Sequence, residues 1–487
     1  MEDTALDPRR WQMLPVILTA TFMALFDFFV VNVAAPSLER DLHASSSELQ
    51  LVVGGYAFSY ATGLITGGRL GDLFGYRRLF MGGMAGFAVA SLLCGLAQNP
   101  TELIVARLIQ GFAGAAMVPQ VLSLITNTFA PVERPRALGY FGMTVGAGSV
   151  AGQVIGGLLL QADLFHLGWR SIFLVNVPIG AVAIVLAARL LPHTRSAVRP
   201  RLDAFGALTV SASLALALIP LVMGQSQGWP AWCWVSLALA GPALAAALWW
   251  ERRLAQSGGD PIVDLSLFRR RSFSAGTAIN AAFMCFFGSF MLGITVLLQS
   301  GLGLSPLQSG LSFTPLGVAF ALTSLAGNQL RARYGTGVIA RGAVVAAGGV
   351  AALLIELWVA GSSVTVAGLV IPMTVVGIGT GMVIPSLIGV VLTGVDPHRA
   401  GAASGVLTTA QQFASATGVA ILGVVFFNAL GSAPDLATYT SAILPMLVFN
   451  LALLTGALLL TRLLAPERQD QVGILARIRE LADSVAA

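Results

Sequence analysis

Long apolar runs alternate with short polar segments along the whole chain. Each run holds about 20 residues, and a helix of that length crosses the ~30 Å hydrocarbon core of a bilayer with its backbone hydrogen bonds satisfied internally. The pattern therefore predicts an all-α integral membrane protein with fourteen transmembrane helices. The predicted spans are 14–38, 49–70, 79–97, 102–128, 136–161, 169–191, 204–224, 231–250, 272–298, 306–330, 338–360, 364–393, 400–428 and 441–464.

The composition supports a membrane protein and limits its chemistry. Hydrophobic residues make up 56% of the chain and charged residues 10%, a balance that is not typical of water-soluble domains. The longest connections, 192–203 and 251–271, are too short for a soluble catalytic domain. All 27 residues counted as Lys plus Arg are Arg. Without a lysine there is no Walker A site, so we expect neither ATP nor any other cofactor.

The arginines predict the orientation, because cytoplasmic loops retain positive charge during insertion. One set of loops is rich in arginine, whereas the opposite set holds little beyond Arg40 and Arg170. We therefore expect both termini in the cytoplasm of a bacterium, with the protein in the inner (plasma) membrane and its basic loops against anionic lipid rather than nucleic acid. The arginines of the first set are Arg9, Arg10, Arg77, Arg78, Arg134, Arg136, Arg195, Arg199, Arg201, Arg252, Arg253, Arg269, Arg270, Arg271, Arg331, Arg333, Arg399 and Arg468.

Two parts of the chain echo each other. Segment 67–75, which ends the second span, shares Gly, Leu and Gly at the same spacing with 327–335, which ends the tenth. Arg136-Ala137 with Gly142 likewise matches Arg399-Ala400 with Gly405. We therefore predict two six-helix bundles related by a pseudo-two-fold axis, with two helices inserted between them and a substrate site at their interface. The expected domains are 1–191, the two-helix linker 192–271, 272–464 and a cytoplasmic tail, 465–487.

Asp27 is the only charge between Arg10 and Glu39 and lies inside the first span. A carboxylate in hydrocarbon costs about 2.5–3.5 kcal/mol on insertion scales, so such residues usually face a cavity and have a function. Arg107 of the fourth span lies at a similar depth, within roughly 10 Å by helix rise. We predict that Asp27 alternates between a proton and the substrate while Arg107 tunes it; the alternative is a buried pair that fixes helix packing. Glu356 lies near the outer end of its span, which favours an interfacial position.

Several motifs resemble the major facilitator superfamily, and in particular its fourteen-span branch of drug:proton antiporters. Segment 68–78 resembles the signature loop after the second helix but departs from it at Leu73 and Tyr76. Segment 107–111 is similar to the Arg-x-x-Gln-Gly motif of the fourth helix, and 148–157 to the antiporter motif of the fifth, with Gln153 in place of the usual proline. Asp27 with 31–36, together with 169–173 and 176–180, resembles the fourteen-span branch.

The resemblance and the residue chemistry assign roles to three groups. We expect a conformational latch, in which the Asp72 carboxylate binds nearby arginines when the halves close on the cytoplasmic side; its residues are Gly68, Arg69, Asp72, Gly75, Arg77 and Arg78. The antiporter helix has a small-residue face for close packing, formed by Gly148, Gly152, Gly156 and Gly157, and it also contains Gln153. The substrate-binding candidates are Phe26, Val31, Asn32, Gln110, Asn280, Phe283, Phe287, Gln411 and Gln412; the alternative for the aromatic residues is packing or contact with lipid.

These observations predict a proton-coupled antiporter that exports hydrophobic or cationic drugs or natural products by alternating access. Two alternatives stay open: an exporter or flippase of lipid-like metabolites, and a membrane-embedded enzyme or receptor. The latter needs a catalytic constellation that we do not find within the spans. Cys94, Cys233 and Cys285 have no disulfide or metal-site spacing, so no metal is expected, and we expect a monomer.

Overall fold

The structure is a computed structural model that describes residues 8–192, 203–224, 227–392, 395–396, 399–430 and 435–464. The described residues form helices joined by short connections and contain no strand. The helices are α1 (Arg10–Leu42), α2 (Ser46–Phe74), α3 (Tyr76–Leu96), α4 (Pro100–Thr128), α5 (Arg134–Ala162), α6 (Ser171–Leu174), α7 (Asn176–Leu190), α8 (Ala204–Met223), α9 (Ala231–Gln256), α10 (Arg271–Val296), α11 (Pro306–Ser312), α12 (Thr314–Tyr334), α13 (Gly337–Ala360), α14 (Val366–Leu392), α15 (Ala400–Leu430) and α16 (Leu436–Leu460).

The prediction of an all-α membrane protein is confirmed. Within the described residues, eleven helices are long and apolar enough to cross a membrane. The long helices α2, α8 and α12 are not among these eleven, so the count of fourteen spans stays a prediction. The predicted tail 465–487 lies outside the described residues, as do Arg195, Arg199, Arg201 and Arg468.

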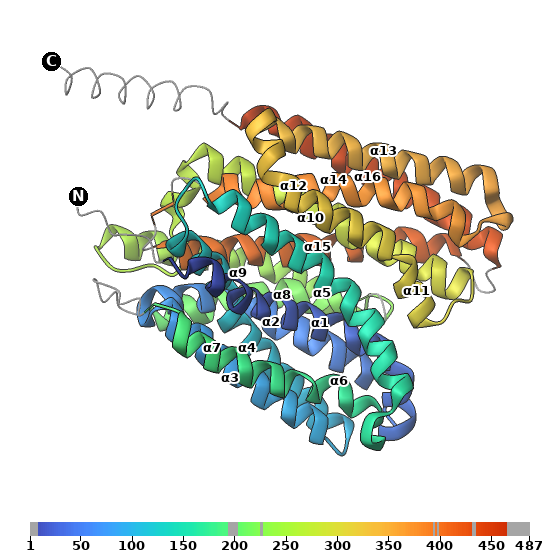
Figure 1. The fold of residues 1–487 in the computed structure, drawn as a ribbon, viewed down its shortest axis with the longest axis horizontal. Helices are drawn as coiled ribbons and strands as arrows, with labels where there is room; N and C mark the ends of the chain where they lie inside the picture. Colours follow the sequence, from blue (N-terminus) through green and yellow to red (C-terminus); the bar gives the residue numbers. More distant parts are fainter. Residues whose placement is uncertain are drawn as a thin grey trace.

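The helices form two bundles with the same internal packing (Figure 1). In the first bundle, α1–α7, helix α4 packs against α2 and α3, α1 against α5, and α3 against α7. In the second bundle, α10–α16, helix α14 packs against α12 and α13, α10 against α15, and α13 against α16. This correspondence is what an internal repeat requires. The exact domain boundaries stay predictions.

Glycines end equivalent helices in the two bundles, at the positions that the repeated segments predict. Gly75 follows α2 with φ 89°, and Gly335 follows α12 with φ 57°. Only glycine adopts such positive φ values without strain, which explains its use at these two helix ends. We call the end of the bundle where α1 begins and α16 ends the terminal face, and the other end the far face (Figure 1). Both glycines lie at the terminal face.

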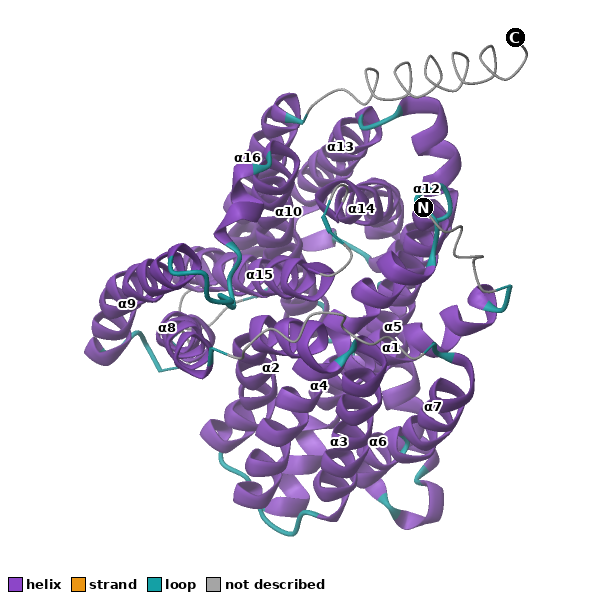
Figure 2. Ribbon diagram, turned by 90° about the vertical axis from the view of Figure 1, so that its left-hand side faces the viewer, coloured by secondary structure: helices purple, strands orange, loops and turns teal. Residues whose placement is uncertain are grey.

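The two bundles meet along two seams. One is formed by α2 and α15, the other by α5 and α12. The inserted hairpin of α8 and α9 lies beside the first seam, where α8 packs against both α2 and α15. Figure 2 shows the α5 and α12 seam on the opposite side of the molecule from this hairpin. The two sides of the protein therefore differ.

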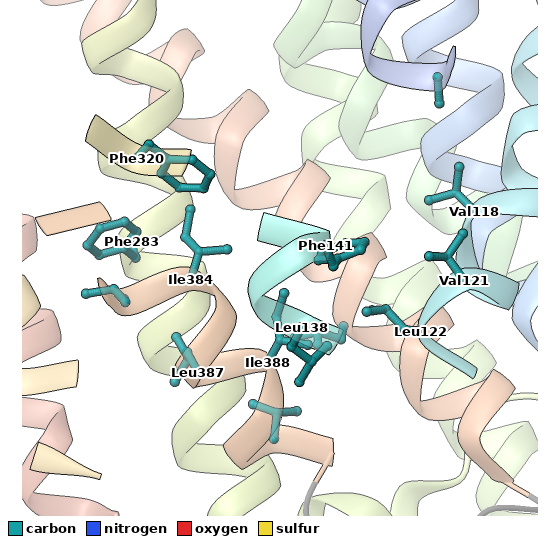
Figure 3. Close-up of a cluster of buried hydrophobic side chains, with 14 of the residues drawn as sticks. Val118, Val121, Leu122, Leu138, Phe141, Phe283, Phe320, Ile384, Leu387 and Ile388 are labelled. Atoms are coloured by element: carbon teal, nitrogen blue, oxygen red, sulfur yellow. The ribbon is translucent and has the colours of Figure 1, made fainter. Parts of the chain in front are cut away.

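Apolar side chains join the bundles between the two seams (Figure 3). Residues of α4 and α5 in the first bundle pack in one cluster with residues of α10, α12 and α14 in the second. The contributing side chains include Val118, Val121, Leu122, Leu138, Phe141, Phe283, Phe320, Ile384, Leu387 and Ile388. Between membrane helices such contacts act through close van der Waals packing, and here they join the two bundles toward the terminal face.

Candidate functional site

Close packing of α1 against α5 fixes the position of Asp27. Glycines spaced four residues apart on α5 lie on one helix face and let α1 approach. An added Cβ at Gly152 would lie 2.8 Å from the Phe26 carbonyl oxygen, and one at Gly156 would lie 2.4 Å from Val30 Cγ2. Larger residues at these sites would push α1 away. The antiporter motif therefore packs directly against the part of α1 that carries the carboxylate.

Asp27 of α1 is fully buried and is held by side chains from two other helices, α4 and α7. Arg107 of α4 forms an ion pair with one carboxylate oxygen, Oδ2. The other oxygen, Oδ1, accepts hydrogen bonds from Gln110 Nε2 at 2.8 Å and from Asn176 Nδ2 of α7 at 3.1 Å. Gln110 Nε2 also donates to Ser91 of α3 at 2.8 Å. A buried charge needs such partners because losing one typically costs 3–5 kcal/mol.

Arg107 is also fully buried, and its guanidinium is fixed on several sides. Its Nε donates to the Val52 carbonyl at 3.1 Å and its Nη1 to Gln110 Oε1 at 2.8 Å. The guanidinium carbon lies 4.3 Å from the ring centroid of Tyr56 and 5.7 Å from that of Phe173. The remaining nitrogen, Nη2, is buried without a hydrogen-bond partner in the described residues. The N–H groups of this nitrogen are thus unused by the described part of the chain.

All these contacts belong to the first bundle. The partners of Asp27 and Arg107 lie on α1, α2, α4, α6 and α7, with α3 reached through Gln110. The two charged side chains are completely shielded from solvent. The site can therefore exchange a proton with water only after the helices around it move or water enters between them.

The second charged motif connects the two bundles at the terminal face. Asp72 lies at the end of α2, just beyond the predicted span 49–70, and accepts hydrogen bonds from the backbone nitrogens of Gly401 at 2.9 Å and Ala402 at 3.0 Å. It also accepts from the Tyr76 hydroxyl at 2.8 Å, and Arg69 Nη1 lies 3.8 Å away. Burial raises the pKa of Asp72 to about 6, against the lowering effect of these donors and of Arg69. The N-terminus of α15 thus docks on a carboxylate of α2.

Of the other predicted latch residues, Gly68 and Arg69 lie at the contact between α2 and α15, whereas Arg77 and Arg78 lie away from it. An added Cβ at Gly68 would lie 2.3 Å from the Gly401 carbonyl oxygen, so the two helix backbones touch here. Arg69 also approaches Asp260, at 3.8 Å, in the connection between α9 and α10. Arg77 instead donates to the Ala188 carbonyl at the end of α7, and Arg78 is exposed. The predicted arginine cluster around Asp72 is therefore reduced to Arg69.

The α5 glycines face two different neighbours. Gly148, Gly152 and Gly156 face α1, whereas an added Cβ at Gly157 would lie 2.9 Å from Leu307 Cδ1 of α11. Three further glycines that the motif did not include face the second bundle: Gly139, Gly142 and Gly146, which meet Ser324, Pro385 and Phe320. The side chain of Gln153 lies outside the described residues.

The substrate-binding candidates do not come together as one group. Gln110 belongs to the Asp27 site, and Asn32 has a side chain outside the described residues. Phe26 and Val31 are buried against neighbouring helices of the first bundle. In the second bundle Phe283 is fully buried within the apolar cluster, while Phe287 and Gln412 are half-buried. Phe283 therefore does not line a pocket. It packs in the core, which is the alternative stated above for the aromatic candidates.

Two polar candidates of the second bundle do meet. Gln411 Nε2 of α15 donates to Asn280 Oδ1 of α10 at 3.3 Å, and Asn280 Nδ2 is buried without a partner in the described residues. Glu356, near the end of α13, lies against Gly368 of α14, where an added Cβ would be 2.1 Å from its carboxylate. Glu356 therefore lies close to the far face and distant from Asn280. This position agrees with the expectation that Glu356 is at the membrane interface.

Sequence reasoning missed several residues of both sites. Tyr56 and Ser91 carried no charge or motif, and Asn176 was noted only as part of a motif. Gly401 was missed because its role comes from its backbone nitrogen, and Tyr76 because it was noted only as a departure from a motif. In the described residues there is no His, Cys, Asp and Glu cluster that could hold a metal ion.

Comparisons with known proteins agree with this architecture. A sequence model of the Major Facilitator Superfamily matches residues 17–204 and 198–419. The solved structure of the human organic anion transporter MFSD10 superposes with a TM-score of 0.62, covering 92% of this chain and 100% of that one at 17% identity, which supports the fold alone.

Several curated relatives are named as antibiotic export or resistance proteins. The chain is 42% identical to a probable actinorhodin transporter of Streptomyces coelicolor over 87% of its own length and 74% of the relative's. It is 35% identical to the puromycin resistance protein of Streptomyces alboniger, over 94% and 91%. It is also 35% identical to a cephamycin export protein of Amycolatopsis lactamdurans, over 89% of each chain. Together with the two-bundle fold, these matches show that the chain belongs to the Major Facilitator Superfamily, as a membrane transporter and not an enzyme.

Proposed function

We propose that this transporter is a proton-coupled antiporter that exports antibiotics from a bacterial cytoplasm by alternating access. The observation that carries this proposal is the buried Asp27, whose carboxylate is paired with Arg107 and two amides inside a membrane domain. Intramembrane carboxylates with such partners are typical of proton pathways. The substrate class follows from relatives named for actinorhodin, puromycin and cephamycin.

Protonation gives a physical mechanism for coupling. When Asp27 is ionised, Arg107 is neutralised and the three helices that carry Asp27, Arg107 and Asn176 are drawn together. A proton on Asp27 weakens the ion pair and leaves the Arg107 charge uncompensated, so the first bundle favours another arrangement. We propose that this arrangement opens the substrate site to the opposite side. A proton gradient directed into the cell then drives export, because each proton enters as substrate leaves.

The contact of Asp72 with Gly401 and Ala402 is proposed to be the latch. It joins the bundles at the terminal face, which we place in the cytoplasm because the arginine-rich ends of the helices lie there. The latch holds while the transporter is closed to the cytoplasm and breaks when the bundles rock apart. The monomer is the proposed functional unit, because each chain contains both bundles.

The test is efflux from proteoliposomes driven by an imposed pH gradient, with each of the three antibiotics as substrate. Asp27→Asn keeps the hydrogen-bonding shape of the side chain but cannot ionise, so gradient-driven efflux should fall to the level of empty liposomes. Glu39→Gln is the matched control, because Glu39 is an exposed carboxylate on the same helix. If gradient-driven efflux in Asp27→Asn equals that of wild type, Asp27 does not couple transport to protons and the proposal is wrong.

A further inference from the structure

A groove of about 900 Å³ lies between α1 and α5 in the half of the molecule next to the terminal face. It runs along α1 from Trp11 to Phe22. Eleven residues of helix rise about 16 Å, which is close to half of the ~30 Å hydrocarbon core. The groove therefore has the length of one leaflet's acyl chain.

The groove belongs to the first bundle alone. Its lining residues come from α1 and α5, with Ile179 of α7 at its edge. The substrate interface between the bundles, by contrast, requires residues of both. Helix α5, which forms one wall of the groove, lies away from the α8 and α9 hairpin (Figure 2). The groove is thus placed to receive a molecule from the bilayer.

The walls of the groove are apolar in effect. The hydroxyl of Thr19 donates to the Pro15 carbonyl at 2.9 Å, and that of Thr144 to the Tyr140 carbonyl at 2.9 Å. Both hydroxyl donors are therefore used within their own helices. Apart from Tyr140 and the residues at the mouth, Trp11 and Arg136, what remains for an occupant is hydrocarbon surface, including that of Met143.

The mouth of the groove carries an exposed positive charge. The Arg136 guanidinium lies 4.8 Å from the centroid of the Trp11 ring, and the Arg136 side chain forms no ion pair with the described residues. The neighbouring Glu133 is neutralised by Arg10 at 2.8 Å. A tryptophan beside a cation at a predicted membrane interface matches the depth of a lipid headgroup.

We propose that this groove binds one anionic phospholipid of the cytoplasmic leaflet, with an acyl chain along α1 and α5 and its phosphate beside Arg136. The proposal uses the orientation proposed above but not proton coupling, so either can fail alone. A cation near an anionic headgroup contributes about 1 kcal/mol, equivalent to about a fivefold preference. Length, apolar walls and charge at the mouth together favour a lipid over a small polar ligand.

Native mass spectrometry of delipidated protein, titrated with phosphatidylglycerol or phosphatidylcholine of equal chain length, tests the proposal. Wild type should bind the first phosphatidylglycerol about fivefold more tightly than phosphatidylcholine. Arg136→Gln should abolish this preference and Arg136→Lys should keep it. Ala147→Phe, which fills the groove from an exposed position, should weaken binding of both lipids.

The matched control is Arg252→Gln, which removes an exposed arginine from the terminal end of α9, on the hairpin side. It should leave the lipid preference intact. If Arg252→Gln and Arg136→Gln lose the preference for phosphatidylglycerol equally, the preference comes from the general surface charge and the proposal is overturned. Unchanged lipid binding in Ala147→Phe would do the same, as would displacement of the bound lipid by an exported antibiotic, which would assign the groove to substrate entry. Thermal unfolding of each variant separates misfolding from lost binding.

Discussion

Arg107 and Asp27 form an ion pair in which both side chains are completely buried. Their described partners come from the first bundle, so the second bundle senses the pair only through helix packing. The glycines of α5 provide that route, because they touch α1 on one face and α12 and α14 on another. A shift of α1 caused by a change of charge at Asp27 is therefore transmitted through α5 to the interface between the bundles.

Arg107→Lys should reduce proton-driven efflux by at least about tenfold. Lysine keeps the charge but cannot bind Val52, Gln110 and Asp27 at once, and each lost hydrogen bond to a charged group costs about 1.5–3 kcal/mol. The measurement is efflux from proteoliposomes. Arg40→Lys, at an exposed site at the end of α1, is the control. Wild-type efflux in Arg107→Lys would show that its charge alone suffices.

The sequence predicted the Asp27 site better than the latch, and the reason is geometric. Helix rise places Asp27 and Arg107 at a similar depth, so their contact requires only that α1 and α4 be neighbours in the same bundle. The contact of Asp72 with Gly401 depends on how α2 and α15 of different bundles pair, which local patterns do not encode. Phe283 shows the same limit, because its position on α10 does not reveal whether that face meets a cavity or the core. Gln110 lies one turn from Arg107, a spacing that would have placed it at the Asp27 site.

Gly401→Ala should shift the transporter away from the state that is closed at the terminal face. The new Cβ would lie 2.2 Å from the Gly68 carbonyl oxygen and 2.4 Å from Asp72 Oδ1, and overpacking of this kind costs about 1–3 kcal/mol. Spin labels at Phe74→Cys and Arg333→Cys, exposed positions on the two bundles, measure the opening as a longer distance.

Gly456→Ala is the control for this shift, because nothing lies within 4 Å of a Cβ added there. It should leave the distance distribution of wild type unchanged. The native cysteines Cys94, Cys233 and Cys285 are replaced by alanine in all samples. A Gly401→Ala distribution that coincides with that of wild type would show that the close backbone approach does not hold the terminal face closed.

Acid should favour the closed terminal face through Asp72. In the closed state its pKa is about 6, raised by burial from 3.8, whereas an open terminal face exposes the carboxyl and returns its pKa toward the ordinary value. The closed state then binds the proton more tightly, so the closed fraction rises as pH falls through 6 and declines above it. Between pH 7.5 and 5 the ratio of closed to open should rise by up to about tenfold.

The same pair of spin labels measures this pH dependence. Asp72→Asn removes the titrating group while keeping an acceptor oxygen for the α15 backbone, so its distance distribution should respond much less to pH. Tyr76→Phe removes one donor to Asp72 and should move the midpoint to higher pH. A pH response of equal size in Asp72→Asn and wild type would assign it to another group.

Asn280 and Gln411 should affect substrate recognition without affecting proton coupling. They form a hydrogen-bonded pair between α10 and α15, and the Asn280 amide keeps one buried donor unpaired in the described residues. A substrate acceptor that binds this donor gains about 1 kcal/mol or more, so Asn280→Ala should raise the half-saturating antibiotic concentration about fivefold. The proton-to-substrate ratio should stay unchanged because Asp27 lies in the other bundle.

Thr455→Ala, which removes an exposed hydroxyl bonded only to its own helix at Leu451, is the control. If Asn280→Ala lowers proton and substrate flux in parallel at saturating antibiotic, the pair serves the transport cycle itself, and the division of labour between the bundles is wrong.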